Sequence, residues 1–346
     1  MRRYTALLLT AFVLLLLAAV CSSYLAGRDH TEAHAPLMEL TAYTTLPAEH
    51  ASILAEAYET AHRIRVNFIP LTSAELMKKL QMDVEQGRHG ADLVLADREV
   101  LLQTAAKGYL QPYISEQNDA VRSYFKDENG HWTGVWYDPI VFCVNRDYLK
   151  TLSAIPDTWT ALAEFPDVRI GITDFLAADA SGNLMYQMIG QYGDAAAYQI
   201  LRGLHPKVIQ YAKYLSNPVR QAGMGEADIS IAVASETMRY IHDGYPLKII
   251  YPADGTAWLL TGSAVPLGTS GMEQSEAQLF ADWLLSDEAQ IALQERNFFF
   301  LPTNPGTMAY KRFAGKNLVL YQQIPLFTAE QKHAFLDRWV KHVRLQ

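Results

Sequence analysis

An apolar segment near the middle of the chain, residues 136–144, constrains the fold more than any other feature. Its aromatic and β-branched side chains predict a buried strand, which ends at Asn145-Arg146-Asp147. A Pro-Asp-Thr-Trp run at residues 156–159 follows after a loop and predicts the start of a new helix. A chain of 346 residues is long for a single hydrophobic core, so this order indicates a passage between two lobes.

The composition is that of an acidic globular protein. Half of the residues are hydrophobic and 19% are charged. The formal net charge is -8 and the isoelectric point is about 5.7. Because binding to nucleic acid requires a basic face, we expect no nucleic acid partner.

The first 21 residues have the pattern of a targeting segment. Arg2 and Arg3 precede an uncharged, leucine-rich run from Tyr4 to Ala19, and the next charge is Arg28. Residues 1–21 are therefore predicted to be a signal peptide or a membrane anchor, since the uncharged run is long enough for either.

Cys21 follows a run that resembles a lipoprotein signal-peptidase box, which predicts lipidation at Cys21. Ala18 and Val20 depart from the usual residues of that box, so an uncleaved anchor is the alternative. Residues 22–36 are predicted to be a polar tether. Both hypotheses place the remaining chain outside the cytoplasm, in the periplasm or anchored at the outer face of the cytoplasmic membrane.

The second cysteine, Cys143, lies inside the apolar segment. A catalytic thiol needs a nearby base and exposure, so we expect Cys143 to be a buried structural thiol.

Strand and helix patterns alternate through the rest of the chain. Predicted strands at 38–43, 64–69 and 92–95 each precede a helix, and the same order returns after residue 169. This alternation predicts an α/β fold in which helices cover a mostly parallel sheet. Thr72 and Glu75 have the spacing of a capping box, and the other predicted helix caps are Thr45, Asp97 and Asn217.

Short motifs with a fixed order support a family resemblance. They are Ala42-Tyr43-Thr44-Thr45, Gly90–Val94, Gly108–Tyr113, Trp136–Leu149, Asp179-Ala180-Ser181-Gly182, Gly225–Ile229, Pro252–Thr256 and Ala277–Gln290. Together they resemble the type II periplasmic-binding-protein-like solute receptors of ABC importers. The resemblance extends to the branch that contains iron(III)-, phosphonate- and sugar-phosphate-binding proteins.

The resemblance implies two lobes, each a mostly parallel sheet flanked by helices, with a ligand cleft between them. Lobe 1 would comprise residues 37–137 and 270–346, and lobe 2 residues 138–269, with hinges near Tyr137 and Thr269. It also implies a monomer that closes around a small solute and then docks on an ABC permease. A sensor input for a signalling partner is an alternative role.

Helix N-termini with small polar residues are the first candidates for a ligand site, because their N–H groups and hydroxyls favour anions. Each of them is equally well explained as an ordinary helix cap, and Arg98 is equally well explained as a surface residue. The predicted ligand-binding residues are Thr44, Thr45, Thr72, Ser73, Arg98, Tyr137, Asp179, Ser181, Gly182, Asn217, Glu236 and Asp254.

The ligand class follows from these residue types. Iron(III)-binding relatives carry two adjacent tyrosines where this chain has Ser235-Glu236, and the sequence contains no Tyr-Tyr pair. We therefore predict no metal site and no cofactor, and favour a small anion such as a phosphorylated or phosphonate compound. A ferric ion bound with a synergistic anion is the alternative. The chain lacks a Gly-x-Ser-x-Gly elbow, so we expect no catalytic residues and no enzymatic activity.

Overall fold

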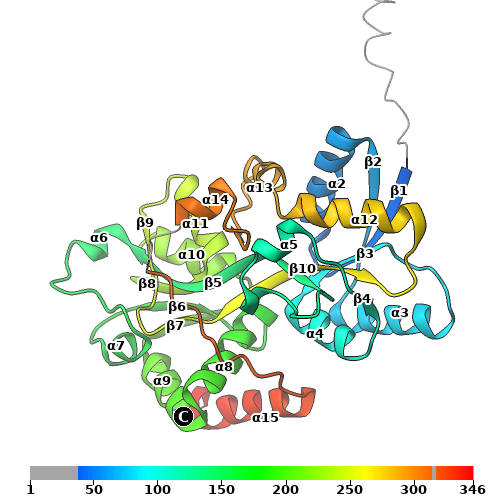
Figure 1. The fold of residues 1–346 in the computed structure, drawn as a ribbon. Coiled ribbons are helices and arrows are strands. Elements are labelled where there is room, and N and C mark those ends of the chain that lie inside the picture. Colours follow the sequence, from blue (N-terminus) through cyan, green and yellow to red (C-terminus); the bar gives the residue numbers. More distant parts are fainter. Residues whose placement is uncertain (1–37, 314–316, 346) are drawn as a thin grey trace, which may run out of the picture.

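The computed structural model describes residues 38–313 and 317–345, so the predicted signal or anchor, the tether and Cys21 lie outside the described residues. One curled sheet runs through two lobes in the order β2-β1-β3-β10-β5-β8-β6-β7 (Figure 1). Within the described residues no helix is long and apolar enough to cross a membrane.

The first lobe begins with three parallel strands, each followed closely by a helix, as the alternation predicted. Leu40, Leu54 and Phe280 belong to its core, which α12 and α13 also cover. The elements are β1 (Met38–Thr44), α2 (Ala48–His62), β2 (Ile64–Pro70), α3 (Ser73–Glu85), β3 (Leu93–Asp97), α4 (Arg98–Ala106), α12 (Gly271–Leu284) and α13 (Asp287–Gln294).

The second lobe repeats the arrangement around a core of its own. β6 pairs in parallel with β7 and β8, and Phe142, Trp159 and Met188 are among the buried core residues. Its elements are α7 (Trp159–Glu164), β6 (Ile170–Thr173), α8 (Asp179–Tyr192), α9 (Asp194–Leu204), β7 (Val208–Ala212), α10 (Ser216–Gly223), β8 (Ile229–Val233), α11 (Ala234–His242) and β9 (Leu247–Ile250).

The strand predicted at the centre of the chain joins the two lobes. β5 (Thr133–Asn145) is buried along its whole length. Its first half pairs antiparallel with β10 (Trp258–Pro266), and its second half pairs antiparallel with β8 and β9. The α/β architecture is confirmed. The parallel pairs of each lobe, β1 with β2 and β3 and β6 with β7 and β8, lie on either side of the antiparallel crossing strands β5 and β10. Cys143 is free and buried on β5, as predicted, and burial raises the pKa of its thiol to about 12.

Two segments pack with a different lobe from the one expected. β10 pairs with β3 and β4 of the first lobe, although residues 138–269 were expected in the second. Thr269 is buried there and its hydroxyl donates to the Ala91 carbonyl, so the chain returns to the first lobe near Trp258 and not near Thr269. We therefore propose hinges near Tyr137 and Trp258.

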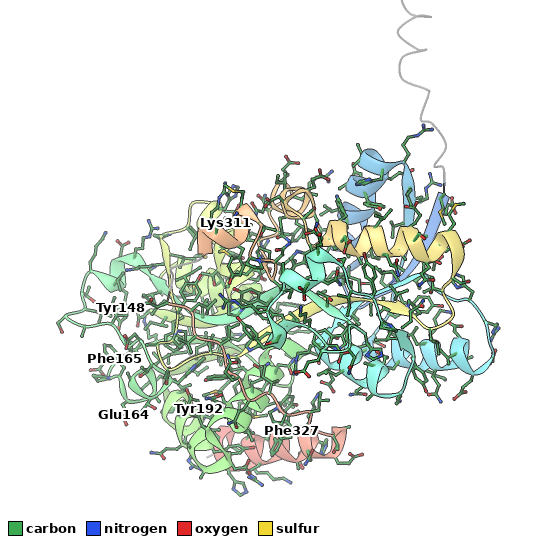
Figure 2. All side chains as sticks on the ribbon, viewed as in Figure 1. Tyr148, Glu164, Phe165, Tyr192, Lys311 and Phe327 are labelled. Atoms are coloured by element: carbon green, nitrogen blue, oxygen red, sulfur yellow. The ribbon has the colours of Figure 1, made fainter. Side chains whose placement is uncertain are left out.

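The C-terminal helix α15 (Ala329–Trp339) was expected in the first lobe but packs on the second. Trp339 contacts the rings of Phe175 and Tyr211 edge-on, and Phe327 packs against Phe335 beside this helix (Figure 2). Trp339 of α15 belongs to the second core, and Phe335 and Leu336 of the same helix pack against it.

The remaining elements are short and connect the lobes and their helices. They are β4 (Leu110–Gln111), α5 (Glu116–Ala120), a 3-10 turn (Ser123–Phe125), α6 (Arg146–Leu149), a second 3-10 turn (His205–Lys207), β11 (Leu301–Pro302), α14 (Met308–Phe313) and a π-helical turn (Val340–Arg344).

Candidate functional site

Two adjoining cavities lie between elements of the two lobes. The larger, which we call the cleft cavity, has a volume of about 800 Å³, and the smaller, which we call the aromatic pocket, has a volume of about 240 Å³. Leu46, Leu259 and Thr261 line both, so the cavities meet at these residues. The cleft cavity is within the range of small-molecule sites, which is about 300–1,000 Å³.

The first-lobe wall of the cleft cavity forms at the carboxyl ends of β1 and β3. The Thr45 hydroxyl accepts a hydrogen bond from the Asp97 N–H at 3.1 Å. The Ser73 hydroxyl donates to Asp97 Oδ2 at 2.9 Å. These bonds hold together the loops after β1, β2 and β3, which is where ligands of open α/β sheets bind.

Asp97 of the first lobe and Asp179 of the second both line this cavity. The Oδ1 atom of Asp97 is buried and has no hydrogen-bond partner in the described part of the chain. Burial raises the pKa of Asp97, and the negative charges of Asp179 and Glu99 raise it further. A hydroxyl or ammonium group between the two carboxylates would offset both effects.

Arg98 contributes a cation to the same wall. Its Nε atom is buried and has no hydrogen-bond partner among residues 38–313 and 317–345. Burial lowers the pKa of the guanidinium, but an arginine in a protein keeps its charge. A planar, charged donor left unpaired in a cavity is suited to bind carboxylate or phosphate oxygens.

The second-lobe wall is the start of α8, with Asp179 and Gly182 at the cavity. The N-cap residue Ala178 offers no side-chain hydrogen bond, so α8 lacks the usual side-chain cap. The Gln187 amide donates to the Trp258 carbonyl at 2.7 Å and accepts from the Trp258 N–H at 3.0 Å. This pair of bonds fixes α8 against the crossing strand β10.

A cation from the C-terminal helix completes the cleft cavity. Lys332 of α15 forms an ion pair with Glu99 of α4, and its ammonium lies 5.5 Å from the centre of the Tyr186 ring. Since α15 packs on the second lobe, this ion pair connects the two lobes beside the cavity.

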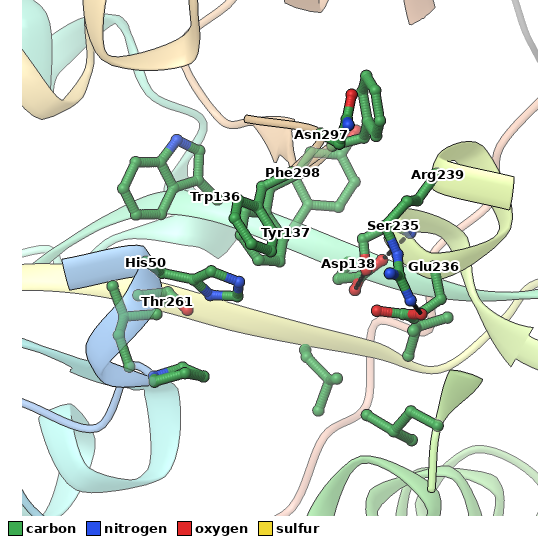
Figure 3. Close-up of a pocket in the computed structure, with 17 residues that line it drawn as sticks. His50, Trp136, Tyr137, Asp138, Ser235, Glu236, Arg239, Thr261, Asn297 and Phe298 are labelled. Carbon is green, nitrogen blue, oxygen red and sulfur yellow. Dashed lines mark hydrogen bonds and ion pairs between the residues drawn. The ribbon is translucent and has the colours of Figure 1, made fainter. Parts of the chain in front are cut away.

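The aromatic pocket has an apolar wall and a charged wall (Figure 3). Asp138 on β5 accepts hydrogen bonds from the Ser235 N–H at 2.9 Å and from its hydroxyl at 2.5 Å. Burial raises the pKa of Asp138 to about 7, and the charge of Glu236 adds to this rise. Glu236 forms an ion pair with Arg239 at 2.5 Å on α11.

Seven of the twelve predicted ligand-binding residues line one of these cavities. Thr45, Ser73, Arg98, Asp179 and Gly182 line the cleft cavity, whereas Tyr137 and Glu236 line the aromatic pocket. Chain segments far apart in the sequence therefore meet in one place, as the resemblance implied. Their part in ligand binding stays a prediction.

Five predicted residues line neither cavity, and most have structural roles. The Thr44 hydroxyl is buried and donates to the Leu95 carbonyl, and Thr72 forms the predicted capping box with Glu75. The Ser181 hydroxyl lies within hydrogen-bond distance of the Asp174 and Ala178 carbonyls. Asp254 accepts from the Trp159 N–H, and Asn217 sits in the first turn of α10.

Three helix caps differ from the expectation. The N-cap of α2 is Pro47 and not Thr45, because the Thr45 hydroxyl is used to bind the Asp97 backbone. Asp97 is the N-cap residue of α4, yet its carboxylate makes no cap bond, since it accepts from Ser73 instead. Helix α10 starts at Ser216, so Asn217 lies inside the helix.

Sequence reasoning missed Asp97, Glu99 and Lys332 as cavity residues. The run Asp97-Arg98-Glu99 directly after a buried strand was a usable signal, because it places three charges at a sheet edge. No local signal marks Lys332, because its position depends on the packing of α15.

The comparisons with known proteins agree with this architecture. Residues 54–314 match the family described as bacterial extracellular solute-binding protein. The chain belongs to this family. Membership implies a small-molecule solute, an extracytoplasmic location and an ABC permease as partner.

A relative in Haemophilus influenzae, described as an uncharacterized protein, is 26% identical over 303 residues, which is 84% of this chain and 86% of the relative. The periplasmic binding protein AfuA from Actinobacillus pleuropneumoniae, with exogenous fructose-6-phosphate bound, has a TM-score of 0.66 and 22% identity. The match covers 90% of this chain and all of AfuA (100%). Iron-bound HitA from Pseudomonas aeruginosa also has a TM-score of 0.66, with 18% identity over 87% of this chain and 98% of HitA. These two likenesses show the fold.

Proposed function

We propose that this protein captures a small anionic solute, with phosphorylated or phosphonate compounds favoured, and delivers it to an ABC permease. In this proposal the protein acts as a monomer, catalyses no reaction, and is held at the membrane through its N-terminal segment. The observation that carries the proposal is Arg98 at the cleft cavity, whose buried Nε atom has no hydrogen-bond partner in the described residues. The solute of AfuA, fructose-6-phosphate, belongs to the favoured class.

The carboxylates around Arg98 support a solute that has hydrogen-bond donors as well as a negative charge. Asp97 and Asp179 would accept from its hydroxyl or ammonium groups, and Arg98 would bind the phosphoryl oxygens. The start of α8 would add backbone N–H groups, because Ala178 leaves it without a side-chain cap.

Ferric ion is the second candidate, because HitA is iron-bound. Among the described residues no group of three or more His, Cys, Asp or Glu side chains is placed to hold a metal ion. Ser235 and Glu236 stand where the iron(III)-binding relatives would carry tyrosines, so the anionic solute is favoured.

A thermal-shift screen of Arg98→Gln against the wild type tests this proposal. A ligand that binds the folded wild type raises its melting temperature by mass action. When the ligand concentration is 100-fold above Kd, the free energy of unfolding rises by about 2.7 kcal/mol. We expect Arg98→Gln to lose about 1.5–3 kcal/mol of binding to the same anion, because it removes charged hydrogen bonds.

Arg202→Gln is the matched control, because Arg202 is exposed on α9 and lines neither cavity. The panel contains phosphate esters, phosphonates, sugars, carboxylates and ferric salts. A shift produced by ferric salts alone, or equal shifts in wild type and Arg98→Gln, would contradict the proposal.

A further inference from the structure

The anion site proposed at Arg98 does not use the aromatic pocket, which Arg98 does not line. Six aromatic side chains line it: His50, Trp136, Tyr137, Phe298, Phe299 and Phe300. Such a wall offers little to a phosphoryl group. Its volume of about 240 Å³ is nevertheless sufficient for one substituted ring, because an apolar cavity of about 150 Å³ accepts benzene.

The rings form an organised wall on the first lobe. Trp136 and Phe300 are stacked with centroids 6.1 Å apart, and His50 meets Phe298 edge-on at 4.0 Å. Trp136 and Tyr137 come from β5, His50 from α2, and the phenylalanines from the segment between α13 and β11. Three separate segments thus present ring faces and edges to one space, which suits a planar guest.

The opposite wall is polar and belongs to the second lobe. Figure 3 shows Ser235, Glu236 and Arg239 across the pocket from His50 and Trp136. Closure of the lobes would therefore bring the ring wall and the polar wall together around whatever lies in the pocket.

Three buried polar atoms of residues that line this pocket lack partners. His50 Nδ1, Trp136 Nε1 and Arg239 Nε have no hydrogen-bond partner within residues 38–313 and 317–345. Burial lowers the pKa of His50, so at neutral pH its ring can donate or accept one hydrogen bond. Unpaired polar atoms at a pocket are satisfied by a guest whose edge carries donors or acceptors.

The aromatic pocket adjoins the proposed anion site. Leu46, Leu259 and Thr261 line both cavities, so the two cavities are direct neighbours. We propose that the solute is a phosphate monoester or phosphonate with a planar aromatic or heteroaromatic ring, held with its anion at Arg98 and its ring in the aromatic pocket. This inference rests on the anion site proposed above.

Calorimetric titration of the purified full chain tests the inference with four probes: benzyl phosphate, cyclohexylmethyl phosphate, fructose-6-phosphate and inorganic phosphate. Ring burial is expected to make benzyl phosphate bind roughly tenfold or more tightly than inorganic phosphate. Contacts between rings should favour benzyl over cyclohexylmethyl phosphate by about two- to tenfold.

The double variant Phe298→Leu, Phe300→Leu should bring the ratio of benzyl to cyclohexylmethyl affinity close to one and leave the affinity for inorganic phosphate unchanged. Leucine keeps the wall apolar, and melting without ligand checks that the variant folds. Phe165→Leu is the matched control, because Phe165 is a partly buried ring of the second core that lines neither cavity.

The outcomes separate the two proposals. Equal affinities for the four probes, each reduced by Arg98→Gln, would overturn the ring subsite and keep the anion site. Tightest binding of fructose-6-phosphate, unaffected by the double leucine variant, would also overturn the ring subsite. Absence of binding by every probe would overturn both proposals.

Discussion

At the residue scale, the site combines buried polar atoms that lack hydrogen-bond partners in the described residues with charged side chains that pair with each other. Arg98 Nε and Asp97 Oδ1 are buried without a hydrogen-bond partner in the described residues, whereas Glu236 and Arg239 pair with each other. An unpaired buried polar group costs free energy, so the first two groups mark where a ligand is expected to bind.

Asp138 gives a pH dependence that is specific to one residue. Burial raises its pKa to about 7 in the folded protein, compared with about 3.9 in an unfolded chain. At pH values between these two pKa values, Asp138 is protonated in the folded protein but ionised in the unfolded chain. The free energy of unfolding therefore falls as pH rises from about 4 to about 7.

We predict that Asp138→Asn removes this decline. Relative to the wild type, the variant should gain roughly 3 kcal/mol in the free energy of unfolding between pH 5 and pH 8. Urea denaturation at both pH values measures this difference, and Asp147→Asn, at an exposed position on α6, is the control. Parallel pH profiles for Asp138→Asn and the wild type would show that Asp138 does not titrate in this range.

At the element scale, local signals located the helices better than their caps. The capping box of α3 formed as predicted, because Thr72 and Glu75 need only each other and the local backbone. Thr45 and Asp97 have equally good cap chemistry, but long-range hydrogen bonds between them and with Ser73 engage their side chains. The hydrogen-bond partners of residues at a sheet edge are distant in the sequence, so a local sequence pattern does not predict them.

We predict that Thr72→Ala lowers the free energy of unfolding by about 1 kcal/mol, because it removes the N-cap of α3. The ligand-induced shift should be unchanged, since Thr72 lines neither cavity. Thr60→Ala is the control, because Thr60 is an exposed residue within α2. A large loss of ligand binding in Thr72→Ala would contradict this prediction and show that Thr72 contributes to ligand binding.

At the scale of the whole molecule, β5, β10 and the passage of the chain from β11 to α15 connect the lobes, and the Lys332–Glu99 ion pair bridges them within the described residues. β5 and β10 run side by side between them, and Lys332 reaches Glu99 from the second-lobe helix α15. We expect the lobes to move as units about the crossing strands β5 and β10.

We predict that solution scattering records a smaller radius of gyration when a ligand identified by the thermal-shift screen is added. Closure brings the walls of both cavities together, so the compact form should be populated in proportion to ligand occupancy. Arg98→Gln at the same ligand concentration supplies the control. An unchanged radius at saturating ligand would exclude lobe closure as the binding mechanism.

The sequence by itself determined the α/β alternation, the buried crossing strand, the buried thiol of Cys143 and the family. These depend on side-chain periodicity and local order, which short segments carry. Only the tertiary structure decided that β10 returns to the first lobe, that α15 packs on the second, and that Asp97, Arg98, Asp179 and Lys332 share one cavity. The physical reason is that burial and charge pairing between distant segments depend on which surfaces meet in the folded protein. A local stretch of sequence does not contain this information.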